Sequence, residues 1–221
     1  MKKLLLAVIV SLSTVSTAAL AEIKVGIILG FTGPIESLTP AMRDGARMAF
    51  DEASNSGNLL GGETITILEA DSTCVDSAAA TAAAEDLVAQ GVSAIMGADC
   101  SGVTGAINAN VAVPNGILMV SPSATSPGLS KINDAGTFWR TAPSDAKGGQ
   151  VLAKLALDRG ISSIAVTYTN NDYGKGLAEV FEAAFAKGGG TITASAAHED
   201  GKADYSSEAV SYTHLTLPTI E

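Results

Sequence analysis

Hydroxyl side chains follow a short apolar run near the middle of the chain. Residues Ile117 to Val120 are continuously apolar, which predicts a strand buried on both faces, as in a parallel sheet. Ser121, Ser123 and Thr125 come directly after it. Hydroxyl groups donate and accept hydrogen bonds, and none of these three is a strong acid, base or nucleophile. Because parallel sheets bind ligands at the carboxyl ends of their strands, this loop is expected to hold a small polar molecule without transforming it.

Motifs for catalysis or cofactor binding are incomplete. The glycines at 26, 30 and 33 do not form the G-x-G-x-x-G fingerprint, and Gly174-Lys175-Gly176 lacks P-loop spacing. No G-x-S-x-G nucleophile elbow occurs. His198 lies in a His-Glu-Asp-Gly stretch that we interpret as a polar turn, where a solvated histidine is favoured over a catalytic one. We therefore expect no catalytic residue, no cofactor and no enzymatic activity.

The chain contains two cysteines, Cys74 and Cys100. An even count in an oxidising compartment favours a disulfide, and two buried free thiols are the alternative. Closing the loop between them would stabilise the fold by roughly 3–4 kcal/mol on the chain-entropy estimate. No metal site is expected, because neither His198 nor His214 has ligand spacing to a cysteine.

The amino terminus has the layout of a secretory signal peptide. Lys2 and Lys3 precede an apolar stretch, and Ala19-Leu20-Ala21 stands before Glu22, so cleavage is expected after Ala21. Serines and threonines interrupt the apolar stretch, which disfavours the alternative of a membrane anchor. No cysteine follows the cleavage site, so no lipid anchor is expected. The predicted location is the periplasm.

The predicted mature chain is acidic. Without Lys2 and Lys3, 11 basic residues stand against 23 acidic ones, a formal charge of −12. Nucleic-acid binding needs a basic surface that displaces counterions, so nucleic acid is not an expected partner. The acidity is interpreted as favouring solubility.

Strand and helix patterns alternate along residues 22–210 and must position the loop described above. Apolar runs predict strands at 23–29, 64–68, 92–96, 117–120, 138–140, 161–168 and 191–196. Helical periodicity predicts helices at about 39–56, 77–90, 103–110, 145–158 and 173–186. Thr39 is expected to cap the first of these helices, with Pro40 in its first turn. The alternation predicts a doubly wound α/β fold with mostly parallel sheets. A crossover near 141–144 would divide the chain into lobes at 22–142 and 143–210.

The last eleven residues, 211–221, differ in composition from those before them. Proline, threonine and tyrosine replace the local alanine, glutamate and serine, and a helical pattern that starts near Tyr205 is interrupted. We interpret 211–221 as a non-native read-through tail. A genuine terminal strand is the alternative.

Several short motifs occur in a characteristic order. They are Ile23-Lys-Val-Gly, Thr32-Gly33-Pro34, Asp71-Ser-Thr-Cys74, Gly97-Ala-Asp-Cys100-Ser101, the segment 116–125, Asn171-Asp-Tyr173-Gly-Lys-Gly-Leu-Ala178 and Asp204-Tyr-Ser-Ser207. Together they resemble the leucine/isoleucine/valine-binding branch of the type I periplasmic binding proteins, which serve ABC transporters. The resemblance implies two α/β lobes that close around an amino acid or a small amide. It also implies that the chain covers about half of a family member and that its second lobe is incomplete.

The resemblance implies roles for individual residues. Ser101 and the hydroxyl of Thr125 would hold the ligand carboxylate, and the backbone carbonyl of Ser123 would receive the ammonium. Tyr173 would contact the ligand from the second lobe. A bridge would join the two cysteines. From residue type alone, Ser101 equally suits a helix cap, and Tyr173 equally suits packing at a helix start.

The expected function is that of a periplasmic receptor which delivers an amino acid or a small amide to the membrane permease of an ABC transporter. Leu38 stands where the branched-chain amino-acid binders have a tyrosine, so Leu38 and Ala124 are expected to form a pocket wall that need not select leucine. A ligand-sensing domain of a receptor or an amide-responsive regulator is the alternative. An exported hydrolase is disfavoured, because no activated nucleophile can be assembled from the sequence.

Overall fold

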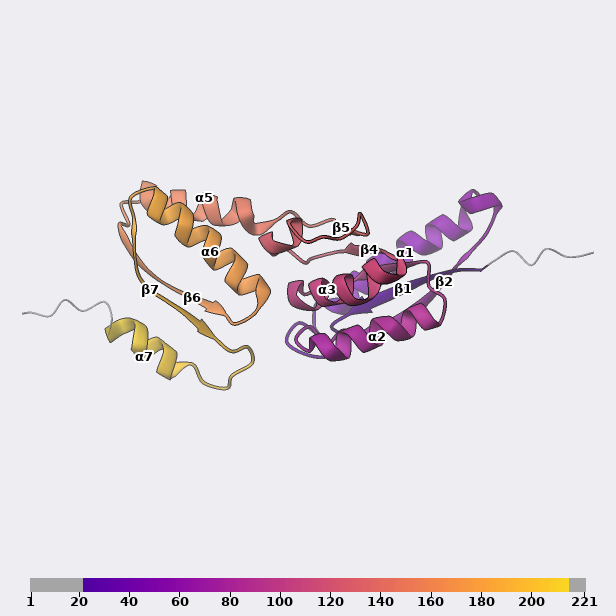
Figure 1. Ribbon diagram of the computed structural model, residues 1–221, viewed down its shortest axis with the longest axis horizontal. Helices are drawn as coiled ribbons and strands as arrows, with labels where there is room; N and C mark the ends of the chain where they lie inside the picture. The colour runs from indigo at the N-terminus through magenta and orange to yellow at the C-terminus, as the bar shows by residue number, and fades with distance from the viewer. Residues whose placement is uncertain (1–21, 215–221) are drawn as a thin grey trace, which may run out of the picture.

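The structure is a computed structural model that describes residues 22–214. It consists of two lobes, a larger one built on strands β1 to β5 and a smaller one built on β6 and β7 (Figure 1). The predicted signal peptide, 1–21, and residues 215–221 of the predicted tail lie outside the described residues.

The first lobe alternates strands and helices, as the sequence predicts. Its strands are β1 (Ile23–Leu29), β2 (Ile65–Asp71), β3 (Ala94–Gly97), β4 (Leu118–Ser121) and β5 (Phe138–Arg140). Its helices are α1 (Thr39–Asn55), α2 (Ser77–Ala89), α3 (Ser101–Ile107) and α4 (Val113–Asn115). The short segments η1 (Leu59–Gly61), η2 (Asn108–Ala112) and η3 (Pro127–Ser130) complete it.

The five strands of the first lobe are parallel and lie in the order β2-β1-β3-β4-β5. The chain passes from β1 to β2 on one side and from β3 through β5 on the other, so the direction of winding reverses between β1 and β3. At such a switch point the loops that follow the two strands separate and leave room for a ligand. The predicted doubly wound fold is confirmed.

The hydrophobic core lies on one face of this sheet. Helices α2 and α3 cover that face, and α1 lies on the opposite side of β1 and β2 (Figure 1). Fully buried side chains of the core include Ala80, Ala84, Leu87, Ile95, Val103, Ile107 and Met119. The small alanines on α2 let the helix approach the strands closely, which fixes the strand ends that carry the site.

Helix α1 begins differently from the prediction. Thr39 is its first residue, and the Thr39 hydroxyl donates to the backbone carbonyl of Glu36 at 3.0 Å. Leu38 occupies the N-cap position without a side-chain hydrogen bond. The prediction of a Thr39 cap is therefore wrong, because the hydroxyl binds the preceding turn instead of the free amides of the helix. Pro40 lies in the first turn, as predicted, where its missing N–H has no helical partner to lose.

The second lobe is smaller and more open. It contains α5 (Asp145–Asp158), β6 (Ser163–Thr169), α6 (Asp172–Lys187), β7 (Thr191–His198) and α7 (Ser206–His214). Strands β6 and β7 are parallel, α5 packs against α6, and α7 lies on the other side of the strands (Figure 1). No residue of β6 or β7 is fully buried, whereas β1 buries five consecutive residues. Helix α7 continues to His214, past the predicted interruption at 211.

Within residues 22–214, no helix is both long enough and apolar enough to span a bilayer.

Candidate functional site

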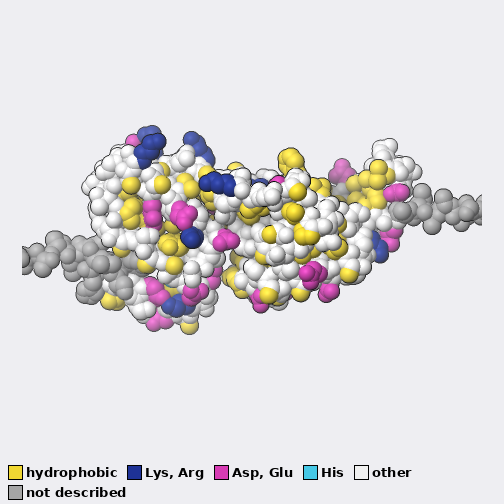
Figure 2. Space-filling model, viewed as in Figure 1, with side chains coloured by type: hydrophobic (Ala, Val, Ile, Leu, Met, Phe, Trp, Pro, Cys, Tyr) yellow, Lys and Arg dark blue, Asp and Glu magenta, His cyan; other side chains and the backbone are white. Residues whose placement is uncertain are grey.

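A cleft of about 860 Å³ opens between the two lobes. Its first-lobe wall is formed by residues that follow β1, β2, β3 and β4, and its second-lobe wall by residues that follow β6 and β7. The space-filling view shows the lobes as two masses that meet along a seam (Figure 2). Because the carboxyl ends of both parallel sheets face this space, the cleft has the position expected for a ligand site.

Most of the predicted site residues converge on this cleft. Leu38, Ser101, Ser123, Thr125 and Tyr173 all line it, as do both cysteines. From Leu38 to Tyr173 they span 135 positions of the sequence, and the two sheets bring them to one place.

Ala124 is the exception, and its predicted place in the pocket wall is wrong. Its side chain is fully buried in the core of the first lobe and does not line the cleft. The Ser121 hydroxyl accepts a hydrogen bond from the Ala124 amide at 3.0 Å, which closes a tight turn directly after β4. This turn directs the methyl group of Ala124 inward, while its neighbours Ser123 and Thr125 line the cleft.

The loop after β4 is held rigidly from several sides. The Ser123 hydroxyl donates to the backbone carbonyl of Asp99 at 2.9 Å. The Arg140 guanidinium donates to the carbonyls of Ala124 and Ser126, at 3.1 and 2.9 Å. Burial lowers the pKa of Arg140, and attraction to the Asp145 carboxylate opposes that shift. A loop fixed in this way is preorganised for a ligand, because it loses little conformational freedom on binding.

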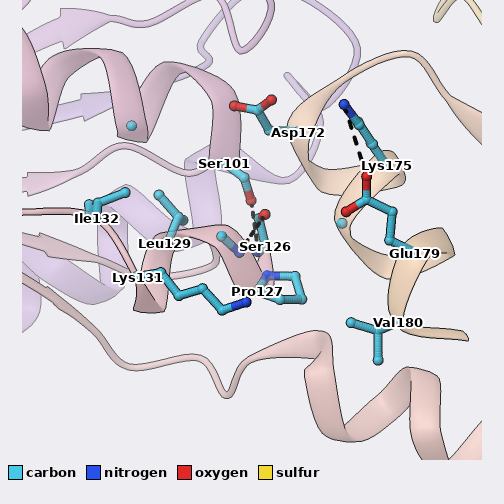
Figure 3. Close-up of a pocket in the computed structure, with 13 residues that line it drawn as sticks. Ser101, Ser126, Pro127, Leu129, Lys131, Ile132, Asp172, Lys175, Glu179 and Val180 are labelled. Atoms are coloured by element: carbon cyan, nitrogen blue, oxygen red, sulfur yellow. Dashed lines mark hydrogen bonds and ion pairs between the residues drawn. The ribbon is translucent and has the colours of Figure 1, made fainter. Parts of the chain in front are cut away.

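Ser101 lies at the base of the cleft and is only 3% exposed. Its hydroxyl oxygen accepts a hydrogen bond from the Ser126 amide at 3.1 Å (Figure 3). A hydroxyl that accepts in this way keeps its own proton, so it can still donate to a carboxylate oxygen. Cys100, not Ser101, occupies the N-cap of α3, and there is no side-chain cap. The alternative that Ser101 merely caps α3 is therefore wrong.

Tyr173 is the second residue of α6 and is 47% exposed. It lines the cleft from the second lobe, so the alternative of a tyrosine packed into the interior at a helix start is not what the structure shows.

Asp99 is a buried acid whose carboxylate forms hydrogen bonds with residues that follow β1, β2 and β3. Its carboxylate accepts hydrogen bonds from the Gly30 amide at 2.8 Å, the Ser72 hydroxyl at 3.2 Å and the Cys100 amide at 3.0 Å. These donors replace water around a side chain that is 3% exposed. Asp99 therefore positions the loops at the switch point between β1 and β3. The available sequence signal for this role was its place after the carboxyl end of β3.

A disulfide joins Cys74 to Cys100, across 26 positions of sequence. The predicted bond is confirmed, and the alternative of two free thiols is wrong. The bond fastens the loop after β2 to the start of α3, so it fixes the wall of the cleft next to Ser101.

Asp145 is a site residue that the sequence reasoning missed. It begins α5 and lines the cleft, and its backbone amide donates to the Thr125 carbonyl at 3.0 Å. Its Oδ2 atom is buried and has no hydrogen-bond partner among residues 22–214. A buried carboxylate oxygen without a donor is unfavourable, so this atom is suited to receive one from a ligand. In the sequence, Ser144 and Asp145 mark the start of a helix. An acid in the first turn of a helix is common, so this position alone does not indicate a ligand contact.

The second-lobe wall contains two further acids that were missed, Glu199 and Asp200. The sequence stretch His198-Glu-Asp-Gly was interpreted as a polar turn, but His198 is the last residue of β7, and its Nδ1 lies 2.8 Å from the Thr167 hydroxyl. The two acids therefore follow the carboxyl end of a strand. That position, at the edge where parallel sheets bind ligands, was the sequence signal that could have identified Glu199 and Asp200 as cleft residues.

A smaller cavity of about 370 Å³ lies behind Ser101, between η3 and α6 (Figure 3). Here the lobes approach closely, since a Cβ atom added at Gly176 would lie 2.9 Å from the Ser126 hydroxyl. Among the predicted ligand residues, only Ser101 borders this cavity. We therefore assign the ligand site to the larger cleft and regard the smaller cavity as part of the packing between the lobes.

Within residues 22–214, no three His, Cys, Asp or Glu side chains are grouped so that they could hold a metal ion.

Two α/β lobes with a hydroxyl-lined cleft at their strand ends define the class of two-lobed ligand-binding proteins. The sequence profile described as "Periplasmic binding protein" matches residues 22–212. The chain belongs to the periplasmic binding protein family, which confirms the resemblance seen in the sequence.

Known relatives bind branched-chain amino acids, according to their names. The Leu/Ile/Val-binding protein BraC3 of Rhizobium johnstonii is 32% identical over 92% of this chain and 55% of its own length. The leucine binding protein LivK of Thermotoga maritima has a TM-score of 0.76 at 25% identity, over 87% of this chain and 53% of that one. LivJ of Streptococcus pneumoniae, in complex with isoleucine, has a TM-score of 0.73 at 28% identity, over 87% and 54%. The chain spans about half the length of the curated relatives it matches.

Proposed function

We propose that the protein is a periplasmic solute-binding receptor that captures an amino acid or a small amide and delivers it to the permease of an ABC transporter. The observation that carries this proposal is the convergence of Ser101, Thr125 and Asp145 on one cleft. Hydroxyl donors suit a carboxylate, and the unpartnered oxygen of Asp145 suits an ammonium. Those two groups are common to all α-amino acids.

In the proposed binding mode, the hydroxyls of Ser101 and Thr125 donate to the ligand carboxylate. Neutral donors can satisfy a carboxylate without a full counter-charge, which agrees with the absence of Lys and Arg from the described cleft lining. The backbone carbonyl of Ser123 and the carboxylate of Asp145 receive the ammonium. Tyr173 covers the ligand from the second lobe when the lobes close.

Closure links binding to delivery. A ligand that contacts both lobes stabilises the closed arrangement by its differential contacts, and a permease can then distinguish loaded from empty receptor by shape. The relatives named for leucine, isoleucine and valine support the transport role. Cleavage after Ala21 would release the receptor into the periplasm. We propose that no chemical conversion accompanies binding, because the hydrogen bonds of the hydroxyls in the described cleft lining run mainly to backbone groups and an asparagine amide, and none activates a hydroxyl through a histidine or a carboxylate.

Isothermal titration calorimetry of the whole protein with a panel of amino acids and short amides tests the proposal. At least one member is expected to bind and, at a hundred times its dissociation constant, to raise the free energy of unfolding by about 2.7 kcal/mol. Ser101→Ala should weaken binding of that ligand at least tenfold. The exposed Ser93, directly before β3, provides the matched control, and Ser93→Ala should leave affinity unchanged. Absence of binding across the panel would contradict the proposal.

A further inference from the structure

The charge of the cleft lining is strongly one-sided. Among the described residues, no Lys or Arg lines the cleft, and every charged residue in its lining is acidic. The acidic residues are Asp99, Asp145, Asp172, Glu199 and Asp200. Three of these acids are accounted for locally. Asp99 is surrounded by hydrogen-bond donors, and Asp145 and Asp172 lie in the first turns of α5 and α6, where the helix dipole favours negative charge. Glu199 and Asp200 follow β7 and lie neither among several hydrogen-bond donors nor in the first turn of a helix.

Two asparagines at the end of β6 orient these two carboxylates. The Asn170 amide nitrogen donates to Glu199 Oε1, and the Asn171 amide nitrogen donates to Asp200 Oδ2, each at 2.8 Å. The orientation of Asn171 is fixed independently, because its Oδ1 accepts the Gly174 amide at 2.9 Å as the cap of α6. Its nitrogen must therefore face Asp200.

No cation neutralises this pair within residues 22–214. Neither Glu199 nor Asp200 forms a salt bridge with Lys or Arg there. Lys202 attracts Glu199 only at longer range, since its ammonium is paired with Glu208. Each carboxylate accepts a hydrogen bond from one neutral asparagine side chain and lies at the cleft.

We propose that the ligand carries a second cationic group, on its side chain, which lies against Glu199 and Asp200. This inference rests on the proposed function and deepens it, because it names the substrate class as basic amino acids or amine-bearing amides of net positive charge. The α-carbon groups would be held on the first lobe, and the side-chain cation would extend to the second. A ligand of net negative charge would meet five acids and no base in the described lining, so it would be rejected electrostatically.

The test is isothermal titration calorimetry of the whole protein with L-lysine, L-arginine, L-leucine and L-glutamate at 20 and 300 mM salt. Lysine or arginine should bind at least tenfold more tightly than leucine at low salt, and this preference should shrink at high salt because salt screens exposed charges. Glutamate should not bind. Equal or tighter binding of leucine, without salt dependence, would overturn the inference and leave the proposed function intact. If no member of the wider panel of amino acids and short amides binds, the proposed function fails together with this inference.

Variants that remove the charges of Glu199 and Asp200 test whether these two residues cause the preference for basic amino acids. Glu199→Gln combined with Asp200→Asn should weaken lysine binding about tenfold and change leucine binding less than twofold. Glu85→Gln, an exposed acid on α2, is the matched control and should change neither. An unchanged lysine affinity in the double variant would overturn the assignment. The wild-type ligand ranking and its salt dependence decide the question even if the variant does not fold.

Discussion

Removing the Cys74–Cys100 disulfide gives the most quantitative test of the first-lobe wall. The bond closes a loop of 26 positions that contains α2 and β3, both parts of the core. On the chain-entropy estimate, releasing a loop of that length lowers the free energy of unfolding by about 3.5 kcal/mol. That is a large fraction of the stability of an ordinary domain. Cys74→Ala combined with Cys100→Ala should therefore lower the guanidinium midpoint of the first lobe substantially.

Trp139 offers a local signal for this measurement, because it is the one tryptophan of the chain and lies on β5 of the first lobe. Because its side chain is already 63% exposed in the folded protein, its fluorescence is a secondary probe, and circular dichroism gives the unfolding midpoint. A reducing agent should bring the wild type down to the midpoint of the double variant and leave the double variant unchanged. A loss below about 1 kcal/mol would refute the reasoning that the bond constrains the unfolded chain. Ligand affinity should fall as well, since both cysteines line the cleft.

Two further predictions concern the strand ends that carry the site. Gly97 has φ +132°, and a Cβ there would lie 2.0 Å from the Ile28 carbonyl oxygen, so Gly97→Ala should lower the free energy of unfolding by about 2 kcal/mol or more in denaturant unfolding. Gly45→Ala on α1, where a Cβ meets open space, is the control and should raise the free energy of unfolding by about 0.5–1 kcal/mol. Equal effects of the two substitutions would contradict the claim that Gly97 is required by its backbone conformation and close contact. Burial acts to raise the pKa of Asp71, but hydrogen bonds from Thr32 and Thr73 outweigh it and lower the pKa. The stability that Asp71 contributes is thus present above its unfolded pKa of about 4 and is lost as pH falls through the lower folded value. Asp71→Asn should flatten the fall in stability between pH 5 and 3, and an unchanged acid profile would show that the Thr32 loop does not depend on this charge.

The sequence predicted the succession of elements because most of them carry strong local signals. β1 coincides with its predicted range, and α5 covers the predicted 145–158, with the Ser144 hydroxyl accepting the Ala146 amide as the helix cap. Thr39 failed as a cap because a threonine at a helix start can bond forward or backward, and its choice depends on the preceding turn. Local pattern does not contain that information.

The site was only partly predictable, for a physical reason. Thr125 stands out because hydroxyl residues follow an apolar run, and the strand pattern places such residues at a sheet edge, whereas Ser101 was predicted only through the family resemblance. Ala124 was misplaced because the turn made by Ser121 decides which of three adjacent side chains faces inward. Asp145 was missed because its significance depends on a buried, unpartnered oxygen, which only the packing of α5 beside the β4 loop reveals.

The central claim is that the cleft holds the α-carboxylate and the α-ammonium of an amino acid through Ser101, Thr125 and Asp145. It is tested most directly by calorimetric titration with the amino acid of the panel that binds most tightly, its methyl ester and its N-acetyl derivative. The account predicts that each derivative binds at least about a hundredfold more weakly than the parent, because each removes one charged partner from a buried polar site. Undiminished affinity for both derivatives would contradict it.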